Sequence, residues 1–219
     1  MEQVLAFLEE LAQHNYKEWF DAHKGEYLQA KNTIASVAAE LIGRLAAFDS
    51  RMKGLRVEDC TYRIYRDIRF SADKTPYKTH MGIYVCAGGK KSGRAGYYLH
   101  IEPGTCTYFI CSGLYNPTKE IIKSVREEIM LSGDRFDAAV KAAPGFEVDW
   151  DGALTRLPSG WPEGPYSSYY RLKSYLLIKP LTRRYITADG LARRVARDLK
   201  PTAGFCELLN RCVDYVLEG

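Results

Sequence analysis

Four runs between residues 61 and 113 alternate polar and apolar side chains with a period of two, and they restrict the possible fold more than any other feature. The runs are TYRIYRDIRF, MGIYVCAGG, GYYLHIEPG and TCTYFICSG. This alternation is typical of β-strands that bury one face. The links between the runs are shorter than the crossovers of about a dozen residues that parallel strands need. We therefore predict an antiparallel meander of about four strands.

Helical periodicity frames this predicted meander. Apolar side chains recur at helical spacing in residues 2–13 and 16–47, with a break expected near Gly25. Further elements are predicted as helices at 117–131, 134–142, 188–199 and 201–217, and as a strand at RLKSYLLIKPL. No change of composition divides the 219 residues, a length that suits one domain. We expect a single α+β domain, 1–219, with a central antiparallel sheet packed against N-terminal and C-terminal helices.

The first residues and the cysteines indicate the compartment. The N-terminal residues lack the basic stretch and cleavage site of a signal peptide, and no apolar run reaches the roughly 18 residues that span a membrane. The six cysteines form no Cys-x-x-Cys pair, and several lie among apolar residues. We therefore expect a cytoplasmic protein with reduced cysteines and no membrane attachment.

Positive charge is concentrated in two zones of a chain whose net charge is +4. Residues 62–80 carry five cations against two carboxylates, and residues 179–200 carry seven against two. A general polyanion binder would spread its basic residues more widely. The second zone predicts a solvated helix face with Arg193, Arg194 and Arg197. A nucleic-acid or protein interaction through this zone is the alternative function that stays open.

Alternation also sorts the first three predicted strands into an apolar and a polar face. The polar face gathers Arg63, Asp67, Arg69, His80, Tyr84, Tyr98, His100 and Glu102. Arg66 falls on the apolar side, so it either meets a buried carboxylate or marks a β-bulge. The polar face of an antiparallel sheet can be merely solvated. Two histidines and several tyrosines favour a binding site instead.

The cations around this face exceed the carboxylates that could pair with them. Asp67 and Glu102 can each hold an arginine by two hydrogen bonds, and the surplus predicts a basic pocket for a small molecule that carries phosphate or carboxylate. The predicted ligand-binding residues are Arg63, Arg66, Arg69, Lys74, Tyr77, Lys78, Tyr84 and Tyr98. The candidates for catalysis are His80, His100, Asp67 and Glu102. The sequence decides neither whether the pocket catalyses a reaction nor whether it uses a cofactor.

A metal site is a second interpretation of the same residues. His100 and Glu102 are two apart on a strand and point the same way, and His80 or Asp67 could supply the third ligand of a two-histidine, one-carboxylate site. No HExxH-type spacing supports this arrangement, and the surrounding cations would repel a divalent ion. The prediction from the sequence is therefore a site without a metal.

Several motifs of this chain resemble those of a known family. They are RIYRDIRFSADKTPYKTHMG (63–82), GYYLHIEPG (96–104), NYKEWFDAHKGEY (15–27) and LKSYLLIKPL (172–181). Together they resemble an uncharacterised family of bacterial and fungal proteins, the domain-of-unknown-function family 2461. The resemblance covers essentially the whole chain and implies a single compact α+β domain. It implies no activity, cofactor or catalytic residue.

Overall fold

The computed structural model of the chain describes residues 1–69 and 71–218 and has an α+β fold. Its centre is one antiparallel sheet with the strand order β1-β2-β3-β5-β4. The strands are β1 (Met81–Cys86), β2 (Gly96–Glu102), β3 (Thr107–Leu114), β4 (Glu147–Val148) and β5 (Tyr175–Pro180). The consecutive pairing of β1, β2 and β3 confirms the meander for three of its four predicted strands, and β5 is the predicted later strand.

Helices precede and follow the meander. The α-helices are α1 (Glu2–Gln13), α2 (Lys17–Ala22), α3 (Lys24–Ala46), α4 (Val57–Cys60), α5 (Lys119–Lys141), α6 (Arg183–Thr187), α7 (Leu191–Leu199) and α8 (Ala203–Glu218). Short 3-10 turns are η1 (Ser50–Met52), η2 (Pro103–Thr105), η3 (Ser167–Arg171) and η4 (Lys200–Thr202). The break predicted near Gly25 falls at His23. The helices predicted at 117–131 and 134–142 are one element, α5, with a kink at Ser132.

The hydrophobic core lies between one face of the sheet and helices α3, α7 and α8. Three fully buried side chains point from this face into the core, one from each of the neighbouring strands: Ile83, Leu99 and Ile110. Helix α7 packs against β3 with Val195 and Leu199, which a spacing of four places on one side of a helix. Burying a side chain of this kind contributes about 1.5–3 kcal/mol. The alternation of apolar and polar residues along β1 and β2 therefore determines which face of the sheet packs against the helices.

Helix α8 also completes the hydrogen bonding at the start of β2. The Asn210 side chain accepts a hydrogen bond from the Ala95 amide at 2.9 Å and donates one to the Ala95 carbonyl at 3.1 Å. Both residues are buried. Unpaired backbone groups in a core cost free energy, and here one side chain satisfies two of them.

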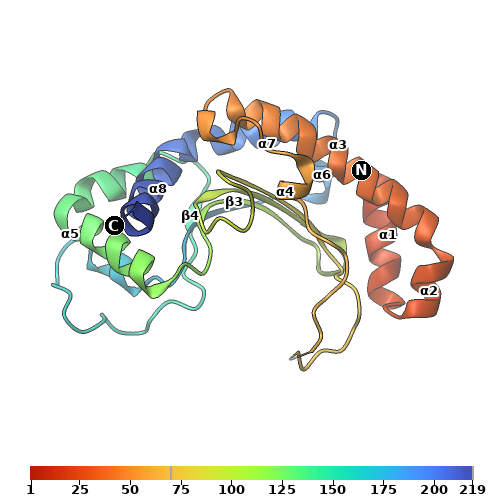
Figure 1. Cartoon of the computed structure of the whole chain (residues 1–219), viewed down its shortest axis with the longest axis horizontal. Helices are drawn as coiled ribbons and strands as arrows, with labels where there is room; N and C mark the ends of the chain where they lie inside the picture. Colours follow the sequence, from red (N-terminus) through yellow and green to blue (C-terminus); the bar gives the residue numbers. More distant parts are fainter. Residues whose placement is uncertain (70, 219) are drawn as a thin grey trace.

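The sheet curves like an arch whose convex side carries the helices (Figure 1). Helices α3, α6 and α7 lie above it in this view, α1 and α2 extend beyond one end, and α5 and α8 lie at the other. The concave side faces the bottom of the view. The partly exposed side chains of Tyr84, Tyr98 and Phe109 lie on this open side, because they alternate with the buried residues of β1, β2 and β3.

The prediction of a first strand at 61–70 is wrong. Residues 62–69 and 71–79 belong to a protruding loop, the arm, which hangs below the arch in Figure 1. Phe70, within the predicted strand, lies outside the described residues. Thr61, just before the arm, forms an isolated bridge with Ile83 of β1, and the two sides of the arm bond to each other, with Arg66 N donating to Pro76 O at 2.9 Å.

The charges of the arm explain why it leaves the sheet. Most of its described residues are polar or charged, and Ile64 and Tyr77 are its buried side chains. The Arg66 guanidinium neither enters the core nor marks a bulge: it bonds to Asp73 and Thr75 on the other side of the arm. Pairing inside the arm keeps these charges in water, where a central strand would have to bury some of them.

Two contacts fasten the arm to the N-terminal helices. The Asn15 side chain donates to the Tyr77 carbonyl at 2.9 Å and accepts from the Tyr77 amide at 3.0 Å. The Tyr77 ring stacks on Phe20 of α2, with 4.0 Å between ring centroids. The base of the arm is therefore held in place on the side of α1 and α2, whereas its tip projects into solvent.

Candidate functional site

The open face of the sheet contains a cavity of about 490 Å³. Two rows of paired residues form its floor, since side chains at paired positions in an antiparallel sheet point to the same side. One row is His100 and Phe109, and the other is Tyr84, Tyr98, Cys111 and Ile178. His80, just before β1, and Tyr62, at the base of the arm, complete the wall nearest the arm.

His100 is the best-connected side chain of this face. Its Nδ1 lies 3.0 Å from the Tyr98 hydroxyl, and its Nε2 lies 3.4 Å from Glu102 Oε2. The other carboxylate oxygen, Oε1, accepts a hydrogen bond from Thr79 at 2.8 Å. The His100 ring also stacks on Phe109, with 4.7 Å between centroids. These contacts fix the orientation of both His100 and Glu102.

Burial controls the protonation of this cluster. It lowers the pKa of His80, and the neighbouring His100 lowers it further. The pKa of His100 is also lowered by burial, which outweighs the opposing effect of Glu102. Burial alone would raise the pKa of Glu102, but hydrogen bonds from Thr79 and His100 lower it overall. The site therefore pairs two neutral histidines with an ionised carboxylate at neutral pH.

His80, His100 and Glu102 form a compact set of possible metal ligands. One ligand atom of each lies within 4.8 Å of the ligand atoms of the other two. The His80 and His100 rings are 4.9 Å apart between centroids. Asp67, the other third ligand considered from the sequence, lies in the arm and pairs with Arg69.

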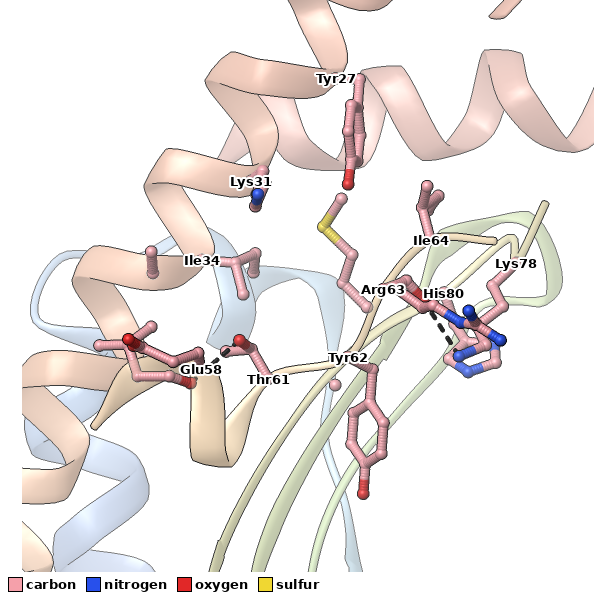
Figure 2. Close-up of a pocket in the computed structure, with 14 residues that line it drawn as sticks. Tyr27, Lys31, Ile34, Glu58, Thr61, Tyr62, Arg63, Ile64, Lys78 and His80 are labelled. Carbon is pink, nitrogen blue, oxygen red and sulfur yellow. Dashed lines mark hydrogen bonds between the residues drawn. The ribbon is translucent and has the colours of Figure 1, made fainter. Parts of the chain in front are cut away.

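A second, smaller cavity of about 250 Å³ is lined by His80 and by residues of α3 and the arm (Figure 2). Figure 2 shows the Arg63 and Lys78 side chains next to His80, and Lys78 Nζ donates to the Arg63 carbonyl at 3.1 Å. His80 and Tyr62 line both cavities. Lys78 Nζ lies 5.5 Å from the Tyr62 ring centroid, and Lys90 Nζ lies 5.8 Å from it. Tyr62 thus lies within reach of two cations, one from each cavity.

The structure divides the predicted site residues into two groups. The residues that line one or both cavities are Arg63, Lys78, His80, Tyr84, Tyr98 and His100. Glu102 lies beside them through its contact with His100. Further along the arm, Asp67 pairs with Arg69, Arg66 pairs with Asp73, and Lys74 donates to the Ile68 carbonyl. Tyr77 is buried against Phe20. The second group therefore lies along the arm, outside both cavities.

Sequence reasoning missed several residues of the larger cavity. Lys90 lies in the link GGKKSG, which has no periodic pattern, and Phe109 belongs to β3, the fourth predicted strand, whose faces the sequence analysis does not sort. Alternation along β3 would have placed Phe109 with Cys111 on one face. No pattern within the sequence indicates that Lys90 approaches Tyr62, because that contact depends on how the arm folds.

Fold and site together define an α+β protein with an open antiparallel sheet whose uncovered face carries a histidine–carboxylate cluster. No helix in the described chain is long and apolar enough to cross a membrane. The chain belongs to the family described as "Conserved hypothetical protein (DUF2461)", whose match covers residues 3–207. No curated protein and no solved structure matches the chain.

Proposed function

We propose that this protein binds a small molecule carrying a carboxylate or phosphate group at the junction of the two cavities. The observation that carries the proposal is a set of cations without carboxylate partners. Among the described residues, Arg63, Lys78 and Lys90 form no ion pair, although all three line a cavity. Two other partly buried cations are paired, Arg51 with Asp49 and Arg94 with Asp214.

The electrostatics around Lys78 support an anionic ligand. Burial lowers the pKa of Lys78, and the charges of Arg63 and Arg66 lower it further. Like charges about 4 Å apart repel by roughly 4 kcal/mol at an effective dielectric constant near 20. A bound anion would offset this repulsion, and it would form charge-assisted hydrogen bonds with the lysines and the arginine.

The rest of the larger cavity suits the organic part of such a ligand. Its volume of about 490 Å³ is within the range of about 300–1,000 Å³ found for small-molecule sites. Phe109, Leu176 and Ile178 supply an apolar wall, and the tyrosine hydroxyls supply hydrogen-bonding groups. We infer a ligand with one anionic end and one apolar or aromatic end.

The histidine cluster gives the pocket a group for proton transfer. In the proposed complex, neutral His100 donates its Nε2–H to Glu102, and its Nδ1 accepts from the Tyr98 hydroxyl. A proton from a bound molecule passes to the Tyr98 hydroxyl oxygen as that hydroxyl gives its own proton to Nδ1. Glu102 then stabilises the resulting imidazolium. Binding and catalysis are separate claims, and the first is tested without the second.

Calorimetric titration tests the proposed binding. The titrants are inorganic phosphate, nucleoside monophosphates, aliphatic dicarboxylates and aromatic carboxylates, each added to the full chain and to the Lys78→Ala/Lys90→Ala variant. We expect at least one organic anion to bind, with affinity reduced ten-fold or more in the double variant. Lys53→Ala, which removes an exposed lysine outside both cavities, is the matched control. Absence of binding across the panel, or equal affinity in the double variant, would refute the proposal.

The alternative, a nucleic-acid or protein interaction through residues 179–200, has less support. Arg183 pairs with Glu2 and Glu9, and Lys179 and Arg197 both pair with Asp198. Arg194 donates to backbone carbonyls in the same zone. Much of the charge is therefore used within the chain. A salt-dependent gel shift that is lost on Arg193→Ala would revive this alternative.

A further inference from the structure

We propose that His80, His100 and Glu102 bind a divalent transition-metal ion on the open face of the sheet. The proposal goes beyond anion binding and stands independently of it, because metal binding is measured without any organic ligand. Two imidazoles and one carboxylate make up a ligand set that Zn²⁺, Fe²⁺, Co²⁺ and Ni²⁺ use. The sequence offered this set only as an alternative, since either His80 or Asp67 could have been the third ligand.

The distances within the cluster fit one ion. His100 Nε2 and Glu102 Oε2 are 3.4 Å apart. Two ligands bound at about 2.1 Å in a tetrahedral arrangement are separated by about the same distance. The ligand atom of His80 is within 4.8 Å of both, so a small rotation of the half-buried His80 ring brings it to the same ion. His80 precedes β1, so the hydrogen bonds between the strands do not fix its position.

The neighbours of the cluster leave the required atoms facing one another. The Tyr98 hydroxyl contacts Nδ1 of His100, so the other nitrogen, Nε2, faces Glu102. Thr79 donates to Oε1 of Glu102 and leaves Oε2 directed at His100. Such outer contacts fix the orientation and tautomer of metal ligands. His100 and Glu102 each have such a supporting hydrogen bond before any ion binds.

The surroundings restrict which ion suits the site. Mg²⁺ and Ca²⁺ prefer sets made of oxygen ligands, and this set has one carboxylate. The single carboxylate neutralises half of the charge of a divalent ion, and the Lys78 and Arg63 side chains lie next to His80 (Figure 2). Zn²⁺ or Co²⁺ bound here would therefore keep a net positive charge and open coordination positions toward the cavity. Those positions would accept water or the anionic group of a ligand.

Side-chain NMR of the histidines tests the site in the full chain. The protein contains four histidines, so their ring nitrogens can be assigned by single substitution. On addition of Zn²⁺ we expect the ring-nitrogen signals of His80 and His100 to shift with one-to-one stoichiometry, while those of His14 and His23 stay in place. Zn²⁺ shifting the His14 signal instead, or shifting none of the four, would overturn the proposal.

Calorimetric titration with Zn²⁺ and Co²⁺ separates the ligands. Glu102→Gln keeps the size of the side chain and removes its charge, so we expect at least a ten-fold loss of affinity, and His80→Ala should abolish one-to-one binding. The control His14→Ala should bind as the wild type does. Circular dichroism melts identify any variant that fails to fold. If Glu102→Gln fails to fold, the affinity of His80→Ala, at a half-buried position, tests the assignment. Unchanged affinity in both Glu102→Gln and His80→Ala contradicts the assignment, whatever the outcome with organic anions.

Discussion

Gly82 lies opposite His100 in the pairing of β1 with β2, and the Tyr98 ring occupies the space beside it. A Cβ atom at this position would approach the Tyr98 hydroxyl to 2.4 Å and the carbons of its ring to 2.7 and 2.8 Å. A glycine is therefore required for a packing reason. It allows Tyr98 to lie flat enough to reach His100 Nδ1 at 3.0 Å.

We expect Gly82→Ala to displace Tyr98 and to lower the free energy of unfolding by about 1–3 kcal/mol, as overpacking does in other cores. Urea unfolding measures the stability, and the Zn²⁺ titration described above should show weaker binding because His100 loses its hydroxyl partner. Gly25→Ala is the matched control, since nothing lies within 4 Å of its added Cβ atom and alanine is the better helix former. Equal stability of Gly82→Ala and the wild type would contradict this account.

Asp49 is a buried carboxylate whose stability contribution depends on pH. It accepts hydrogen bonds from Arg51 Nε at 2.9 Å and from the Tyr97 hydroxyl at 3.0 Å. Burial alone would raise the pKa of Asp49, but Arg51 and Tyr97 lower it overall. A carboxylate with a folded-state pKa below its unfolded value stabilises the protein above the unfolded pKa. That contribution is lost as pH falls through the folded pKa.

We therefore expect Asp49→Asn to be less stable than the wild type at pH 7 by about 1–3 kcal/mol, the cost of an impaired hydrogen bond to a charged partner. The difference should shrink as the pH falls below about 4. Urea unfolding at several pH values measures it. Asp134→Asn, at an exposed position of α5, provides the control, and stability curves that stay parallel for Asp49→Asn and the wild type would count against the mechanism.

A side chain positions the arm, in place of the backbone hydrogen bonds that join neighbouring strands. Asn15 bonds to both backbone groups of Tyr77, so α1 and α2 fix the place of the arm that β1 holds only at its base. Removing two hydrogen bonds typically costs about 1–3 kcal/mol. The cost here falls on a local segment, which makes local opening the sensitive readout.

We expect Asn15→Ala to speed hydrogen exchange at the Tyr77 amide and to make residues 62–79 more sensitive to proteases, because the arm loses its main polar anchor. The ring of Tyr77 still stacks on Phe20, so global unfolding should change less than local exchange. Asn32→Ala, an exposed asparagine of α3, is the comparison. Unaltered exchange at Tyr77 would show that the aromatic stack alone positions the arm.

Patterns along the chain predicted the elements that bury a regular face and failed where the arm bonds to itself. The alternation of Ile83 with Tyr84 and of Leu99 with His100 placed two strands and their faces correctly. The same alternation in 61–70 predicted a strand, yet Arg66 on its apolar face was the sign of a conflict. In the structure Arg66 pairs with Asp73 across the arm, so its charge is not buried in an apolar face. Such a partner, seven residues away in a turn, has no periodic signature.

At the scale of the whole molecule, the site results from covering one face of the sheet and leaving the other open. The helices bury their apolar sides against Ile83, Leu99 and Ile110, so the polar residues between them face the concave side. Sequence analysis predicted the sharing of this face by His80, His100 and Glu102. It did not show that Asp67 and Arg69 lie away from this face, because their position depends on the path of the arm.

Metal binding should also be visible in the stability of the whole chain. An ion that binds only the folded state adds about 2.7 kcal/mol at a hundred times its Kd. For a chain of this length such a gain raises Tm by roughly 5–10 °C. We expect this shift on addition of Zn²⁺, its reversal by a chelator and its loss in Glu102→Gln. An equal shift in that variant would place the binding elsewhere on the surface.

The two hydrogen bonds between Asn210 and Ala95 affect the order in which parts of the chain fold during synthesis. The two partners are 115 residues apart, so α8 leaves the ribosome well after β2. Strands β1, β2 and β3 can pair while later residues are still being added, because their contacts are local. The polar groups of Ala95 must wait for α8. They are therefore satisfied only after the chain has been synthesised through Asn210.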